Sequence, residues 1–132
     1  MHRGIKAVIL GCVVMVTGCA TPSGPLAVLP MTSPAAAQDN LEGIQQYHDG
    51  KWQEAKSRFE SAIRADPDLP EAHFNLALTL HKLGNHREAT IHFKKASELA
   101  PNNKEILNSP TYRNHLGLSS TLERHLSGGY RY

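Results

Sequence analysis

Apolar and small residues recur along the middle of the chain with one fixed spacing. Residues 40–67 and 74–101 carry the same residue at six positions, and the two members of each pair are 34 residues apart. The pairs are Gly50 and Gly84, Glu54 and Glu88, Ala55 and Ala89, Phe59 and Phe93, Ala62 and Ala96, and Pro67 and Pro101. A period of this length is typical of helical repeats, in which each unit is a helix pair that cannot bury its apolar face alone. The pattern therefore predicts helix, turn, helix, twice.

Turn residues set the ends of these helices. Gly50 and Gly84 stand where the first helix of each unit must end in a left-handed conformation, which glycine adopts without steric penalty. Pro67 and Pro101 stop the second helix of each unit, because proline disfavours helical geometry at the residue before it. Pro70 fits the first turn of the next helix, where a missing N–H costs nothing. The repeated alanines and phenylalanines lie at helical spacing and predict close packing within each pair.

The residues before the first unit predict a tether. Residues 19–38 are rich in Ala, Pro, Ser and Thr, and from residue 20 to residue 37 they carry no charge, so we interpret them as a semi-extended segment. Asp39 followed by Glu42 predicts a capping box that starts the first helix. An alternative is that four apolar side chains of this segment lie against the membrane or a partner; they are Leu26, Val28, Leu29 and Met31.

The repeated residues resemble the tetratricopeptide repeat (TPR) family. The pattern is Ala55 and Phe59 followed by Pro67, with the same three residues in the second unit, and it has the family's period. Helix A, the first helix of the second unit, carries Leu76, Ala77 and Leu80 at the family's Leu, Gly and Tyr positions. His73 stands there in place of the usual Trp. In the first unit Gly43 fits, whereas Glu42 and Gln46 replace apolar residues.

The resemblance implies an all-α fold. We expect two TPR helix-turn-helix repeats over residues 39–103 and a degenerate helical cap over residues 104–126, which together form a short right-handed α-solenoid. Within the cap, Ser109 followed by Pro110 interrupts the pattern and can begin a new helix. Ser120 with Glu123 predicts a further capping box, and residues 127–132 are interpreted as a flexible tail or a contact point.

TPR domains commonly bind a peptide along the concave face that their A helices form. In this chain nine residues match that face: Asn40, Ile44, Tyr47, His48, Glu71, Phe74, Leu78, His81 and Lys82. Asn75 fits one position of the family's carboxylate clamp, but Ile44 and Leu78 replace polar members, so the resemblance favours a mixed aromatic and aliphatic groove. We expect an exposed stripe of Ile44, Tyr47, Phe74 and Leu78; the alternative is that these four side chains belong to the core.

The first eighteen residues are interpreted as a signal peptide. Arg3 and Lys6 precede an apolar run over residues 7–16, which is too short to span a bilayer comfortably. The next residues resemble a bacterial lipobox, Val16-Thr17-Gly18-Cys19, which implies that Cys19 is lipidated as the first mature residue. Ala20 then favours an outer-membrane lipoprotein on the periplasmic face. A plain signal peptide, cut near Ala20 or after residues 35–37, is the alternative.

Charge and cysteine content narrow the function. The chain has 14 Lys and Arg and 12 Asp and Glu, and removal of Arg3 and Lys6 leaves twelve of each sign (14 − 2 = 12). A neutral mature domain gives no electrostatic case for binding nucleic acid or anionic lipid. Cys12 would be lost with the signal and Cys19 lipidated, so no disulfide is expected.

No catalytic motif is present, so we expect an adaptor and not an enzyme. Seven histidines follow the signal: His48, His73, His81, His86, His92, His115 and His125. His81 and His115 are 34 apart, and His48 precedes His81 by 33, so these three could line one face. No carboxylate or cysteine joins them at ligand spacing, and we expect polar groove residues, with no metal and no cofactor. A His-rich metal- or haem-handling module is the alternative to a protein-binding adaptor in an envelope assembly.

Overall fold

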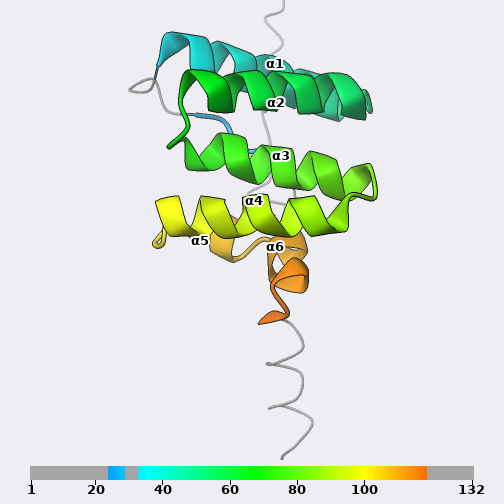
Figure 1. The fold of residues 1–132 in the computed structure, drawn as a ribbon, viewed down its shortest axis with the longest axis vertical. Helices are drawn as coiled ribbons and strands as arrows, with labels where there is room; N and C mark the ends of the chain where they lie inside the picture. Colours follow the sequence, from blue (N-terminus) through cyan, green and yellow to red (C-terminus); the bar gives the residue numbers. More distant parts are fainter. Residues whose placement is uncertain (1–23, 29–32, 119–132) are drawn as a thin grey trace, which may run out of the picture.

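Six helices run through the part of the chain that the computed structural model describes, residues 24–28 and 33–118 (Figure 1). They are α1 (Pro34–His48), α2 (Trp52–Ala65), α3 (Pro70–Lys82), α4 (His86–Leu99), α5 (Lys104–Leu107) and α6 (Pro110–His115). The described residues contain no strand, and the all-α prediction is confirmed. The pair α1 and α2 stacks on the pair α3 and α4, and α5 and α6 cover the outer side of α4. The arrangement is a short TPR-like helical solenoid.

The repeated turn residues act as the sequence predicts. Gly50 and Gly84 have φ angles of 74° and 81°, in the left-handed region that favours glycine. In both turns the amide of the next residue donates to a carbonyl five residues earlier, at 2.9 and 2.8 Å. The helices α2 and α4 end two residues before Pro67 and Pro101, and Pro70 is the first residue of α3. The two helix pairs are therefore closed by the same local devices.

Phe59 and Phe93 form the centre of the two repeats. Both rings are fully buried, as are the four repeated alanines that flank them, Ala55, Ala62, Ala89 and Ala96. Gly43 of α1 lies directly against Phe59, and a Cβ atom at Gly43 would be only 2.6 Å from the ring. Small residues thus let the helices of a pair approach until the phenylalanine fills the space between them.

The start of α1 differs from the prediction. The helix begins at Pro34, whose missing amide hydrogen costs nothing in a first turn, and it continues through three alanines, the strongest helix formers. Asp39 is therefore inside the helix, and the predicted capping box does not exist. The tether predicted to extend to residue 38 is correspondingly shorter, because its last five residues are helical.

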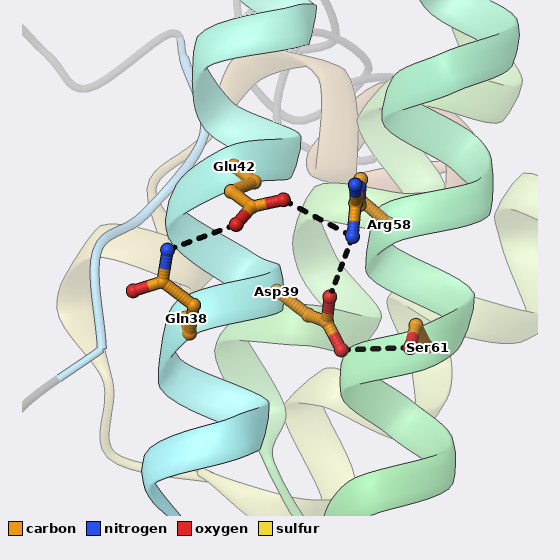
Figure 2. Close-up of polar contacts among 5 residues, drawn as sticks. All are labelled: Gln38, Asp39, Glu42, Arg58 and Ser61. Carbon is orange, nitrogen blue, oxygen red and sulfur yellow. Dashed lines mark hydrogen bonds and ion pairs between the residues drawn. The ribbon is translucent and has the colours of Figure 1, made fainter.

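The two acidic residues of the supposed capping box join α1 to α2 instead (Figure 2). One guanidinium nitrogen of Arg58 lies 3.2 Å from Asp39 Oδ1 and 3.0 Å from Glu42 Oε2. Ser61 donates to the second oxygen of Asp39 at 2.7 Å, and Gln38 donates to Glu42 at 2.9 Å. This network explains how the first repeat tolerates Glu42 at a position where the family usually has an apolar residue.

The C-terminal helices are capped by side chains. The Asn103 side chain accepts hydrogen bonds from two amides at the start of α5, and Ser109 accepts one from Tyr112 at the start of α6, as expected for Ser109. Ile106 and Tyr112 are buried, and the Tyr112 ring lies 6.0 Å from that of Phe93. Residues 104–118 thus cover the open end of the second repeat. The capping box expected at Ser120 and the tail at 127–132 lie outside the described residues.

Among the described residues, no helix is both long enough and apolar enough to cross a bilayer.

Candidate functional site

Two buried asparagines, one from the first helix of each repeat, form hydrogen bonds to the backbone of a segment that is distant in sequence. Asn40 of α1 and Asn75 of α3 are fully buried, and Asn75 Nδ2 donates to Asn40 Oδ1 at 2.8 Å. The Asn75 side chain accepts a hydrogen bond from the Leu26 amide at 2.6 Å and donates to the Leu26 carbonyl at 2.8 Å. Asn40 donates to the same carbonyl at 3.0 Å. Both backbone polar groups of Leu26 are therefore bound by carboxamides.

This arrangement holds an extended peptide unit and one apolar side chain. The bonds to the amide and the carbonyl are independent of sequence, because every residue except proline offers both groups. The Leu26 side chain is only 7% exposed and belongs to the main core cluster. Beside it, residues 27 and 28 and α1 enclose a hollow of about 260 Å³, with Ala37, Leu41 and Ile44 among its lining. The geometry is that of a site for an extended apolar segment, and the chain's own residues 24–28 fill it.

The prediction of an exposed stripe on the A helices is wrong. Phe74 and Leu78 are 1% and 2% exposed, and Tyr47 is 8% exposed. The Phe74 ring packs against Phe93 with a centroid distance of 5.6 Å. These three residues are core, which was the alternative interpretation, and Ile44 is only partly buried against them.

The reason for the error lies in the position of α3. Every residue of α3 from 72 to 80 is buried, because the helix is sandwiched between the first helix pair, α4 and the segment around Leu26. A helix that is covered on all sides has no exposed stripe to offer a partner. The apolar pattern alone could not reveal this, since the covering segment is 49 residues away in sequence.

The remaining residues expected at the concave face lie in different surroundings. Glu71 and His81 are partly buried, while His48 and Lys82 are exposed. The Lys82 ammonium lies 5.9 Å from the centre of the Trp52 ring, which in turn packs edge-on against Tyr47 at 4.9 Å. The exposed ends of α1 and α3 therefore present a cation and a histidine beside an aromatic pair.

The structure brings together a different set of histidines from the one expected. His81 and His115 do meet, with Nδ1 of His81 2.9 Å from Nε2 of His115. His48 is not with them; its ring lies beside Tyr47. His86 completes the group, with its ring centre 5.1 Å from that of His81 and 5.5 Å from that of His115. Burial lowers the pKa of His81 and His115, and the neighbouring histidines lower the pKa of each further.

A second histidine pair joins the first turn of α3 to the middle of α4. Nδ1 of His73 is 3.0 Å from Nδ1 of His92, and Nε2 of His73 lies 3.0 Å from the Pro67 carbonyl. Because a carbonyl only accepts, His73 carries its hydrogen on Nε2, and His92 donates to the bare Nδ1. Burial lowers the pKa of both histidines.

Two residues of these sites, Leu26 and His86, were not predicted from the sequence. A third, Asn75, was predicted in a different role. Leu26 was noted as apolar but assigned to a tether, and Asn75 was considered only as a clamp residue for a carboxylate. His86 follows the turn at Gly84, which reverses the chain and so brings residues 81 and 86 into contact. The signal that could have indicated the peptide site is a polar residue in the first helix of each repeat at nearly the same level, as with Asn40 and Asn75, which are 35 residues apart.

Cys19, the residue expected to carry lipid, lies outside the described residues. The structure therefore leaves the lipidation hypothesis as a prediction.

Comparison with known proteins agrees with the fold. Residues 46–108 match the family model described as Tetratricopeptide repeat. The match supports a tetratricopeptide repeat protein, and it spans the end of α1, all of α2 to α5 and the turns between them. No curated protein matched the sequence. The family consists typically of non-catalytic scaffolds, and its repeats are modules for protein–protein interaction.

Proposed function

We propose that the protein is a membrane-anchored adaptor that binds an extended segment of a partner protein between α1 and α3. The observation that carries this proposal is the pair of fully buried asparagines bound to the Leu26 backbone. Buried carboxamides are costly unless they are hydrogen-bonded, so the site requires an occupant. Residues 24–28 take that place within the chain, and a partner segment of similar character would take it in a complex.

The same contacts define the partner segment. It is extended, because both backbone groups of one residue must reach Asn75, and it carries an aliphatic side chain where Leu26 now lies. The neighbouring hollow lined by Leu41 and Ile44 has room for a second apolar side chain. The exposed His48 and Lys82 at the helix ends offer additional polar contacts.

A peptide-binding experiment tests the groove. Leu26→Asp places a charge in the core and should expel residues 24–28, so a synthetic peptide with the sequence of residues 22–30 should bind this variant. Adding Asn75→Ala to Leu26→Asp should weaken that binding at least tenfold, because the peptide loses both backbone bonds. Adding Asn85→Ala, at an exposed turn residue, is the matched control and should change nothing. Equal peptide binding with and without Asn75 would refute the groove, provided that circular dichroism shows all variants to be helical.

The cellular setting is a separate part of the proposal. We infer that the chain is a lipoprotein held by Cys19 at the periplasmic face of the bacterial outer membrane, where it serves a larger envelope assembly. The support is the sequence Val16-Thr17-Gly18-Cys19 after a short apolar run, with Ala20 next.

Mass spectrometry tests the anchor. The mature protein should begin at residue 19 and carry acyl chains there, and Cys19→Ala should leave the protein unprocessed or release it from membranes. Cys12→Ala is the control, because Cys12 lies within the signal and should not affect lipidation. A mature N-terminus elsewhere without lipid would contradict the anchor while leaving the groove proposal standing.

A further inference from the structure

Three histidines from three helices converge at the end of the second repeat. His81 lies in the last turn of α3, His86 is the first residue of α4, and His115 is the last residue of α6. One ring nitrogen from each can be chosen so that all three lie within 4.8 Å of one another. His81 and His115 are partly buried and His86 is exposed. The group is thus open to solvent on one side and packed on the other.

Hydrogen bonds fix the nitrogen that His115 presents to the group. The Thr90 hydroxyl donates its one hydrogen to the His86 carbonyl at 2.9 Å. Its 2.9 Å contact with Nδ1 of His115 must therefore use the hydrogen on that nitrogen. Nε2 of His115 therefore carries a lone pair that points into the group, where it accepts the hydrogen of His81 Nδ1 at 2.9 Å and would be released to a metal ion when His81 loses that hydrogen. A histidine held by one nitrogen, with a lone pair on the other, has the arrangement of a metal ligand.

We propose that His81, His86 and His115 together bind one zinc ion. Imidazole nitrogen is a preferred ligand of zinc, and three protein ligands with an open fourth position form a common tetrahedral site. With zinc–nitrogen distances of about 2.0–2.1 Å, the nitrogens of a tetrahedral site lie about 3.3–3.4 Å apart. The separations present here, from 2.9 Å to at most 4.8 Å, bracket that value. Rotation of the exposed His86 ring is the main adjustment required.

The site has a structural consequence because its ligands come from different parts of the fold. His81 and His86 flank the turn of the second repeat, whereas His115 belongs to the cap. An ion held by all three joins α6 to the repeat, so zinc stabilises the folded state by an amount that rises with the logarithm of the free zinc concentration once zinc exceeds its dissociation constant. This inference does not rest on the proposed peptide groove, which lies between α1 and α3.

The second histidine pair provides an internal control. His73 and His92 are about as close as His81 and His115, at 3.0 Å against 2.9 Å, but they join α3 to α4 and not α3 to α6. One nitrogen of His73 is bonded to the Pro67 carbonyl. Among the described residues, no third histidine, cysteine or carboxylate is close enough to form a metal-ligand group with this pair. A contact between two histidines is therefore common to both places, and only one of them has three ligands.

Titration calorimetry with zinc chloride tests the proposal on the full-length chain, purified in detergent without a histidine tag. The wild type should bind one zinc ion, and magnesium should give no heat. His86→Gln should weaken zinc binding at least tenfold, and His115→Gln at least a hundredfold, because His115 is the ligand oriented by Thr90. Thr90→Val should weaken it 10- to 100-fold, the usual effect of removing a group that orients a ligand. His92→Gln and His48→Gln should bind zinc like the wild type.

Two further measurements separate loss of the site from loss of the fold. Zinc should raise the melting temperature of the wild type and of His92→Gln but not that of His86→Gln, whose exposed side chain can change without unfolding the chain. Cobalt in place of zinc should give the intense visible absorption of tetrahedral coordination in the wild type and in His92→Gln, but not in His86→Gln. Absence of zinc binding to the wild type would overturn the proposal. So would unchanged binding in both His86→Gln and His115→Gln, or binding of nickel or copper without zinc.

Discussion

At the scale of single residues, Gly43 shows how little free space the repeats contain. A methyl group at this position would lie 2.6 to 2.9 Å from three atoms of the Phe59 ring. We expect Gly43→Ala to destabilise the protein by up to about 2 kcal/mol, since the cost of overpacking is about 1–3 kcal/mol and the gain in helix propensity about 1 kcal/mol. Urea denaturation measures the change. A more stable variant would show that the ring can move aside at no cost.

Gln46 shows a different defect of packing, a buried polar atom that is not hydrogen-bonded among the described residues. Its side-chain oxygen is buried and has no hydrogen-bond partner among the described residues. We expect Gln46→Leu to raise the free energy of unfolding by about 1 kcal/mol, because the desolvation penalty of the unpaired oxygen disappears. Gln45→Leu is the matched control: Gln45 is exposed and bonded to Asp49, so its replacement should bring no gain. Equal effects of the two changes in urea denaturation would argue against a buried unpaired oxygen.

At the scale of elements, the cap helices complete the second repeat. Ile106 and Tyr112 cover the Phe93 side of α4, and two such buried side chains contribute roughly 1.5–3 kcal/mol each. A chain that ends at residue 103 should therefore lose cooperative unfolding or associate through the exposed face of α4. A chain that ends at residue 118 keeps both helices and should unfold cooperatively. Thermal melts followed by circular dichroism decide the matter, and a cooperative transition in the shorter chain would show that residues 104–118 are dispensable.

The elements are also where sequence reasoning worked best. The ends of α2, α3 and α4 depend on residues within a few positions of each end, such as Gly84 and Pro70, and the repeat displays them twice. The start of α1 was misjudged because two signals competed there. The helix-forming run after Pro34 prevailed over the capping pattern at Asp39, whose carboxylate is used by α2.

The candidate sites were predicted less well, because their contacts join distant parts of the chain. Leu26 and Asn75 are 49 residues apart, and no local pattern pairs them. The repeat period correctly predicted that His81 and His115 lie together. It could not predict His86, which joins them because the turn at Gly84 reverses the chain.

At the scale of the whole molecule, the histidines make stability depend on pH. Burial lowers the pKa of four histidines in the folded state: His73, His81, His92 and His115. Around His73 and His92, Lys95 and Lys56 lower the pKa further, while Asp68, Glu88, Glu60 and the Pro67 carbonyl raise it. In the unfolded chain these histidines titrate near a pKa of about 6.5. Between the lowered folded values and 6.5, the unfolded chain binds more protons than the folded one.

The sign of the pH effect follows from that difference. The stability that these histidines contribute is fully present above pH 6.5 and is lost as the pH falls through their folded pKa values. The urea midpoint should therefore be lower at pH 5.5 than at pH 7.5. His92→Gln should reduce the difference between the two midpoints, and replacement of the exposed His48 should leave it unchanged. Equal midpoints at the two pH values in the wild type would contradict the prediction.

The capture of Leu26 by Asn75 has a consequence for how far the domain can stand from a lipid bilayer. If Cys19 carries the anchor, only seven peptide units separate it from the residue that the asparagines hold (26 − 19 = 7). Seven residues span at most about 25 Å even when fully extended. The short segment then keeps the groove close to the membrane surface. A partner segment that displaced Leu26 would free the chain as far as Pro34, where α1 begins. The segment between the anchor and the domain would then be fifteen residues long (34 − 19 = 15), or at most about 54 Å. Binding of a partner segment at the groove would thereby also set how far the domain can stand from the membrane.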